Sequence, residues 1–98
     1  MYASKNAPLQ APGMKYRHYA PHAKVVLVDD KSLLPMNDEH VMIMSTQKCE
    51  CKHFELLSEK NLYKAFRKAD ELNLKAIYIL NSGDLSYALL NRIEKACH

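Results

Sequence analysis

The sequence predicts one small α/β domain, and three observations support this class. Short apolar runs rich in β-branched and aromatic residues occur at residues 25–28, 41–44 and 76–80. Apolar residues recur at spacings of three and four over residues 58–72 and 84–96, which is the helical period. The length of 98 residues suits one domain. The expected order is therefore β-β-α-β-α, with α+β as the alternative class.

The three apolar runs lack the alternation of a half-exposed strand, so both of their faces are expected to be covered. The second and third strands have a helix between them, which predicts a parallel crossover. Residues 31–39 contain Pro35 and Asn37-Asp38 and suit a long hairpin loop. The first strand is thus expected to pair antiparallel with the second, which would make a small mixed sheet.

Both helices are expected to be amphipathic. Ser58 suits the start of the first helix and Asn73 its left-handed end, while Ser82 or Asp84 would cap the second. The two apolar stripes are Leu62, Ala65, Phe66, Ala69 and Leu72, and then Leu85, Ala88, Leu89, Ile93 and Ala96. Two helices cover only one face of a small sheet. The remaining cover is expected from the N-terminal arm, from helices split between the faces, or from a second subunit, and a homodimer is favoured.

Residues 1–23 are expected to form a flexible basic arm, and residues 24–98 the single folded domain. Residues 1–28 carry four of the basic residues and no Asp or Glu, although the net charge is only +3. No apolar run approaches the roughly 20 residues of a membrane-spanning helix, so no membrane partner is expected. Three cysteines, two of them separated by one residue, make a poor disulfide framework and favour a cytoplasmic location.

Reactive side chains concentrate at Cys49, Cys51 and His53. If the second strand extended this far, its period of two would place all three side chains on one side. Three soft ligands are one short of a closed zinc site, and the one-residue spacing of the cysteines is not the common one. Part-buried cysteines beside a surface histidine are the favoured interpretation, and a metal or thiol site is the weaker one. The remaining candidate ligands, Cys97 and His98, are expected at the far edge of the sheet.

The turn before the second helix is the other half of the predicted site. Strands of a parallel crossover end at the same edge, so this turn should lie beside the cysteine cluster, where α/β sheets bind ligands. A helix start favours an anion, and Gly83 would allow its close approach. The predicted site for a small anionic ligand comprises Cys49, Cys51, His53, Asn81, Ser82, Gly83 and Asp84. The alternative for the turn is simple helix capping.

Basic and aromatic side chains predict an alternative, nucleic-acid binding. Cations interleaved with rings in the arm could neutralise phosphates and stack on bases, and the first helix carries a basic face. The candidate residues are Lys15, Tyr16, Arg17, Tyr19, Lys24, Lys60, Lys64 and Lys68. The competing interpretation of the helix residues is an ordinary solvent face opposite an apolar stripe.

No residues are assigned to catalysis, and no cofactor is expected. Cys51 and His53 lack a further acid or oxyanion hole, and the adjacent acids Asp29 and Asp30 would face opposite sides of a strand. The sequence therefore leans against an enzyme. The predicted function is a small cytoplasmic binding or interaction module whose ligand the sequence does not identify. Nucleic-acid binding is the second interpretation, and a metal or thiol module is the third.

Overall fold

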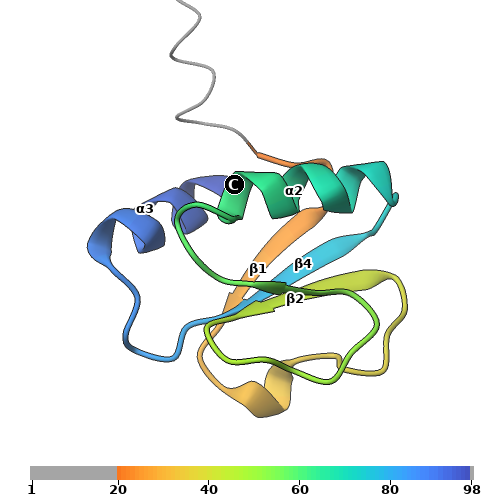
Figure 1. The fold of residues 1–98 in the computed structure, drawn as a ribbon, viewed down its shortest axis with the longest axis horizontal. Coiled ribbons are helices and arrows are strands. Elements are labelled where there is room, and N and C mark those ends of the chain that lie inside the picture. The colour runs from red at the N-terminus through yellow and green to blue at the C-terminus, as the bar shows by residue number, and fades with distance from the viewer. Residues whose placement is uncertain (1–19, 98) are drawn as a thin grey trace, which may run out of the picture.

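The computed structural model describes residues 20–97 as a parallel sheet with two helices (Figure 1). The elements are β1 (Lys24–Val28), the 3-10 helix η1 (Lys31–Leu33), β2 (Val41–Ser45), β3 (Phe54–Leu56), α2 (Leu62–Glu71), β4 (Ala76–Leu80) and α3 (Tyr87–Ala96). The strands form one sheet in the spatial order β1-β4-β2-β3, and each neighbouring pair is parallel. The α/β class is confirmed, as are the two helices and the three expected strands.

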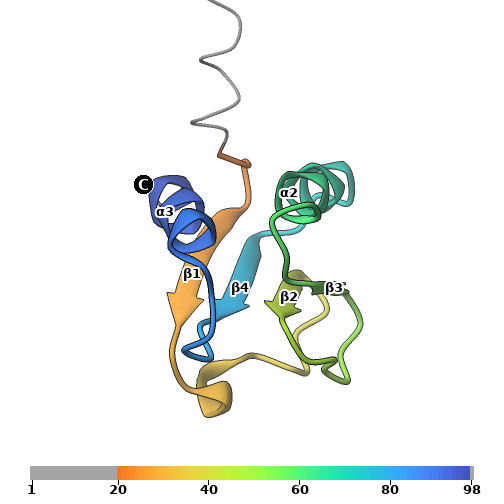
Figure 2. The same ribbon diagram turned by 60° about the vertical axis from the view of Figure 1, so that its left-hand side comes forward.

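The antiparallel pairing predicted for the first two strands is wrong. β4 lies between β1 and β2, so that Tyr78 is aligned with Val26 on one side and with Ile43 on the other. Residues 29–40 therefore cross from β1 to β2 on the face opposite the helices (Figure 2). A parallel connection needs about a dozen residues, and this segment has that length. The long loop that suggested a hairpin is a crossover.

A fourth strand, β3, was not predicted from the sequence. It pairs parallel with β2, with Ile43 opposite Phe54 and Ser45 opposite Leu56. The strand has three residues, none of them buried. A segment this short carries no clear period, and its strand conformation comes from the hydrogen bonds that β2 offers.

Both helices begin later than the sequence suggested. The Ser58 hydroxyl accepts a hydrogen bond from the Asn61 N–H at 3.1 Å, but this closes a turn that precedes α2. The N-cap of α3 is Ser86, not Ser82 or Asp84, and its hydroxyl accepts from the Leu89 N–H at 3.1 Å. The expected left-handed residue after α2 is confirmed, because Asn73 has φ +56°.

The two helices lie together on one face of the sheet (Figure 2). The main core fills the space between them and the sheet, with Phe66, Met42 and Ile77 fully buried. Two crossover loops cover the opposite face, where Leu34 and Cys49 are buried against Ile43. Loops thus supply the cover for which the sequence favoured a second subunit. The homodimer stays a prediction.

The strands alternate between these two cores. In β4, Ile77 and Ile79 pack under the helices, while Tyr78 and Leu80 belong to the loop-covered face. Ala23, which precedes β1, is also buried in the main core. Residues 1–19 of the predicted arm and residue 98 lie outside the described residues. None of the helices in the described part of the chain is long and apolar enough to cross a membrane.

Candidate functional site

The carboxyl edge of the sheet is the place where the chain's polar loops meet. β1, β4 and β2 run parallel and therefore all end at this edge. The chain leaves β1 toward η1 on one face and leaves β4 toward α3 on the other (Figure 2). Neighbouring strands whose connections diverge to opposite faces leave a crevice between them, and this is where open α/β sheets bind ligands.

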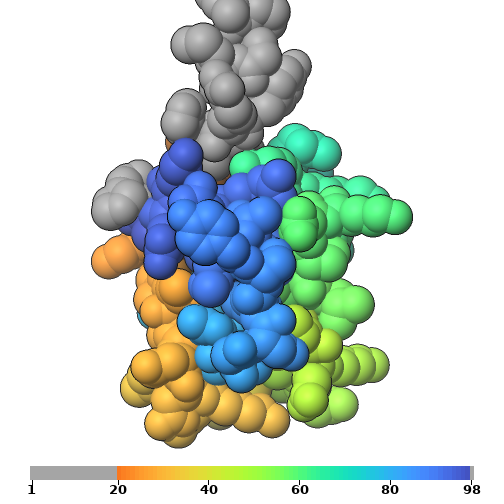
Figure 3. Space-filling view, turned by 90° about the vertical axis from the view of Figure 1, so that its left-hand side faces the viewer, coloured from red at the N-terminus to blue at the C-terminus, as the bar shows by residue number. Residues whose placement is uncertain are grey.

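A pocket of about 300 Å³ opens at this divergence. It is lined by Leu27, Val28, Asp29, Leu33 and Asn81, from the end of β1, η1 and the residue after β4. The Asn81 N–H donates to the Val28 carbonyl at 2.7 Å and continues the β1–β4 pairing beyond the last aligned residues. Figure 3 shows α3, the loop after β4 and the η1 segment side by side on one face of the molecule.

Sequence reasoning placed Asn81 at this edge but missed Asp29 and Leu33. Asp29 directly follows the first strand, which is a signal for the carboxyl edge. The signal could not be used, because the antiparallel pairing would have put the end of the first strand at the opposite edge. Leu33 carries no signal at all, since only the turn of η1 brings it to the pocket.

Residues 81–84 form a turn whose side-chain hydrogen bonds lie mostly within the turn. The Asn81 Oδ1 accepts from the Gly83 N–H at 3.0 Å, and the Ser82 hydroxyl donates to Asp84. Gly83 has φ +92°, a conformation that residues with a Cβ rarely adopt. The Thr46 and Ser82 hydroxyls lie 3.4 Å apart. The turn therefore lies beside the β2–β3 loop as expected, but Thr46 makes the contact.

The cysteine cluster does not form the strand-like array considered above, because β2 ends at Ser45. Cys49 is buried beneath the sheet, and its thiol is directed at the Gln47 carbonyl at 3.6 Å. The half-buried Cys51 thiol is directed at the His53 carbonyl at the same distance. Burial and the neighbouring Cys49 raise the pKa of Cys51, which keeps it a neutral thiol and a weak nucleophile.

No three His, Cys, Asp or Glu side chains among residues 20–97 are placed to hold a metal ion. Cys97 lies beside β1, where its thiol interacts with the Leu27 backbone, whereas Cys49 packs under Ile43 of β2. His98 is outside the described residues.

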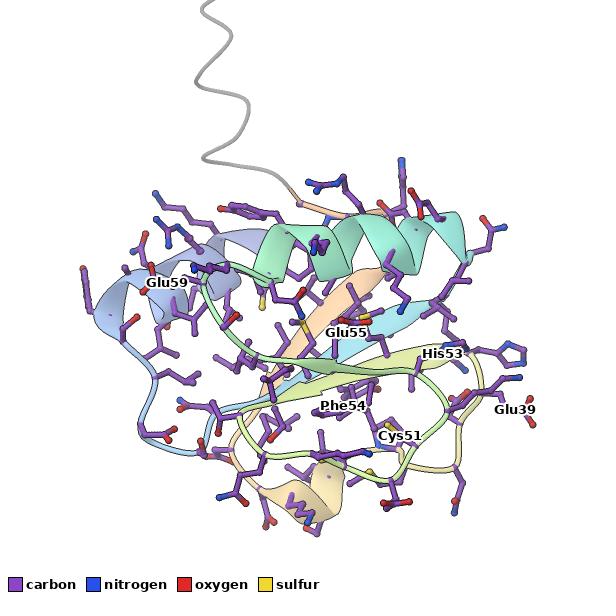
Figure 4. The ribbon with its side chains drawn as sticks, viewed as in Figure 1. Glu39, Cys51, His53, Phe54, Glu55 and Glu59 are labelled. Atoms are coloured by element: carbon purple, nitrogen blue, oxygen red, sulfur yellow. The ribbon has the colours of Figure 1, made fainter. Side chains whose placement is uncertain are left out.

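Several carboxyl groups have lowered pKa values and hold loops in place. Lys68 lies 2.7 Å from Glu55 and lowers its pKa, helped by the Asn61 amide. Arg92 and the Ser86 hydroxyl do the same for Glu59, at 2.8 and 3.1 Å. In Figure 4, Glu55 lies toward α2 while Phe54 lies on the opposite side of the sheet. These acids stay ionised at neutral pH and act as structural anchors.

The predicted basic residues are only partly described. Lys24, Lys60 and Lys64 are exposed, and Lys68 is engaged by Glu55. Lys15, Tyr16, Arg17 and Tyr19 lie outside the described residues. The described residues therefore provide a basic face on α2, and Glu55 of β3 partly neutralises its charge.

Comparison with known proteins gives one family. The family described as "Threonylcarbamoyl-AMP synthase, C-terminal domain" matches residues 2–97. The chain is also 27% identical, over 116 aligned residues, to the threonylcarbamoyl-AMP synthase of Pyrococcus abyssi (strain GE5 / Orsay). That alignment covers 98% of this chain and 34% of the relative, so the chain spans about a third of the relative's length. No solved structure matches.

This match overturns the predicted function. The binding module with no identified ligand, its nucleic-acid alternative and the metal or thiol alternative are wrong, because the chain resembles one domain of a synthase over nearly its whole length. The family match extends over residues 2–97. Neither the cysteine cluster nor the residue 81–84 turn identified it.

Proposed function

This chain belongs to the family of threonylcarbamoyl-AMP synthase C-terminal domains, and from this we propose that it serves such a synthase as an accessory domain. The enzyme would make threonylcarbamoyl-AMP, an activated group for tRNA modification. In this proposal the remaining two-thirds of the enzyme carries the reaction, and the present chain supports it. The family match over residues 2–97 is the observation that carries the proposal.

The arrangement of the acids supports an accessory role. Glu55 and Glu59 have lowered pKa values because Lys68 and Arg92 pair with them. A general acid at neutral pH needs a raised pKa instead. The raised pKa of Cys51 likewise argues against a nucleophilic thiolate.

The proposal is tested with a chimera of the Pyrococcus abyssi synthase. The third of that enzyme that aligns with this chain is replaced by residues 1–98, and the shortened enzyme is the control. Formation of threonylcarbamoyl-AMP from labelled threonine is measured. The chimera is expected to exceed the shortened enzyme, while this chain alone forms no product.

A second measurement protects the test against a chimera that fails to fold. The separate chain is titrated into the shortened enzyme, and binding and product formation are followed together. Saturable binding with a gain in product supports the proposal. Product formation by the isolated chain, or neither binding nor a gain in either format, overturns it.

The proposal also includes a cytoplasmic location and self-association. A cytoplasmic location is supported by the free cysteines Cys49, Cys51 and Cys97, which suit a reducing compartment. Self-association is supported by the large apolar side chains Leu56 and Tyr87, whose residues are 53% and 83% exposed. Fractionation of cells checks the first, and light scattering at high protein concentration checks the second. A monomer at that concentration refutes the homodimer.

A further inference from the structure

We propose that the pocket between the ends of β1 and β4 binds a compact ligand without phosphate groups. The ligand would donate hydrogen bonds, from paired hydroxyls or from an ammonium group, to Asp29 and lay an apolar face against Leu33. This inference goes beyond the proposed function, because it concerns this chain alone and needs no contribution from the rest of a synthase.

The position of the pocket is the first support. β1 and β4 are adjacent and parallel, and their connections leave toward opposite faces of the sheet. The pocket occupies this divergence and takes lining residues from both sides of it: Val28 ends β1, Asp29 follows it, and Asn81 follows β4. Such a crevice exists because the backbone separates there, so a side chain need not move to open it.

The polar groups are the second support. Asp30, next in the chain, is occupied as the cap of η1, where its Oδ1 accepts from the Ser32 N–H at 2.9 Å. Asp29 has no such partner within residues 20–97, and its carboxylate can accept hydrogen bonds from a ligand. The Asn81 carbonyl oxygen is used by Gly83, which leaves the amide NH₂ of Asn81 to donate.

The apolar groups are the third support. Three of the five lining residues, Leu27, Val28 and Leu33, are apolar, and Leu33 is 58% exposed. A ligand lying over Leu33 would remove that apolar surface from water, which is favourable. Ligand sites commonly combine such an apolar wall with a few polar groups.

Charge and size restrict the ligand further. None of the five lining residues is Lys or Arg, and Asp29 would repel an anion. The Gly83 N–H already donates to the Asn81 side chain, and Gly83 is the one glycine in the turn at 81–84. This turn therefore lacks the several free glycine N–H groups that would bind a phosphate. A volume of about 300 Å³ lies at the lower end of small-molecule sites, which suits a compact molecule.

The test uses matched pairs of probes and amide chemical shifts of the isotope-labelled chain. Adenosine supplies paired hydroxyls, and AMP is its phosphorylated counterpart. Phenylethylamine supplies an ammonium group, and phenylacetate is its anionic counterpart. At least one of adenosine and phenylethylamine is expected to bind saturably and to shift the amides of residues 27–29, 33 and 81. Its anionic counterpart should bind more weakly.

Substitutions locate the binding. Asp29→Asn is expected to weaken binding about tenfold, since a neutral amide oxygen replaces the charged carboxylate as the hydrogen-bond acceptor. Leu33→Ala should weaken it as well. The matched controls are Glu71→Gln and Leu72→Ala, because both residues are exposed and precede the start of β4 at the opposite edge. These controls should bind like the unaltered chain.

Each result decides the proposal. Binding of adenosine alone, or of phenylethylamine alone, supports it and identifies the hydroxyl or the ammonium form of the ligand. The proposal is overturned if neither probe gives saturable shifts, or if the anionic counterparts bind as tightly as their partners. It is also overturned if Asp29→Asn binds as tightly as Glu71→Gln. The dispersion of each spectrum shows that the variant is folded.

Discussion

The carboxylate of Asp70 accepts the His22 N–H, with oxygen–nitrogen distances of 3.0 and 3.2 Å. The Ala23 N–H reaches the same carboxylate at 3.2 Å. Asp70 lies near the end of α2, whereas His22 and Ala23 lead into β1. One side chain thus fixes the entry of the first strand against a helix that forms 40 or more residues later in the chain.

We expect Asp70→Ala to lower the free energy of unfolding by about 1–2 kcal/mol, because the exposed His22 N–H and the part-buried Ala23 N–H lose a charged acceptor. Asp70→Asn keeps one carbonyl oxygen and should lose less. Urea unfolding measures both, and amide exchange at His22 and Ala23 should speed up selectively. Equal exchange rates in all three proteins would show that this contact does not hold the strand entry.

The residue after α2 allows a backbone test. Asn73 has φ +56°, which Asn and Gly tolerate and other residues adopt at a cost. Asn73→Ala should therefore destabilise the domain by about 1 kcal/mol. Asn73→Gly is the control and should be neutral or stabilising, since it needs no Cβ in that conformation. An alanine variant as stable as the glycine variant would contradict the left-handed end of the helix.

The main core depends on Phe66, whose side chain is fully buried and packs edge-to-face with Tyr63 at a centroid distance of 6.0 Å. Phe66→Ala removes this contact and leaves a cavity, at a cost of about 3–5 kcal/mol. The free energy of unfolding of a small domain is only about 5–15 kcal/mol, so this loss is a large fraction of it. Thermal unfolding should show a large fall in midpoint. Phe66→Leu keeps most of the volume and should fall much less; similar losses in the two variants would argue against a cavity.

Glu55 gives the domain a defined response to acid. Its pKa lies below the ordinary value of 4.5, first because of the hydrogen bond from Lys68. A group with a depressed folded pKa stabilises the fold fully above its unfolded pKa and loses this contribution as the pH falls through the folded value. Glu55→Gln should cost about 1 kcal/mol at neutral pH, since the pair is partly exposed.

The difference between Glu55→Gln and the unaltered protein should stay constant down to about pH 5 and shrink below pH 4.5. Urea unfolding at a series of pH values measures this. Glu71→Gln provides a control on an exposed acid of α2. A difference that grows on acidification would have the wrong sign for a salt-bridged carboxylate.

The three cysteines should differ in accessibility. Cys97 is exposed, Cys51 is half-buried and Cys49 is buried, so labelling of the native protein should follow that order. The raised pKa values of Cys51 and Cys97 predict slow reaction for both near neutral pH, and faster reaction as the pH rises. Mass spectrometry of the labelled peptides identifies the order. Early labelling of Cys49 would contradict its placement under β2.

Much of the fold follows from local patterns. The runs that became β1, β2 and β4 consist of residues that suit buried strands, and each was located to within a residue. The stripe in α2 was also correct at Leu62, Ala65, Phe66 and Ala69, whereas Leu72 ends up 45% exposed beyond the helix. These features depend on the spacing of apolar side chains, which can be read directly from the sequence.

The order of the strands could not be obtained in the same way. A loop of residues 29–40 is long enough for either a hairpin or a crossover, and its residues suit both. The choice depends on which neighbour best covers β1, and β4 is more than 40 residues away in the sequence. The wrong strand pairing also affected the predicted site, because it placed Asp29 at the edge of the sheet opposite the pocket.

By itself, the sequence determined the class of the domain, the positions of three strands, the presence and C-terminal ends of both helices, and the left-handed residue Asn73. Each of these is set by contacts within a few residues, through period and backbone preference. Only the tertiary structure decided that β4 lies beside β1, that loops cover the second face, and that Asp29, Leu33 and Asn81 share a pocket. Those outcomes depend on competition among distant segments for the same buried surface, which no local pattern records.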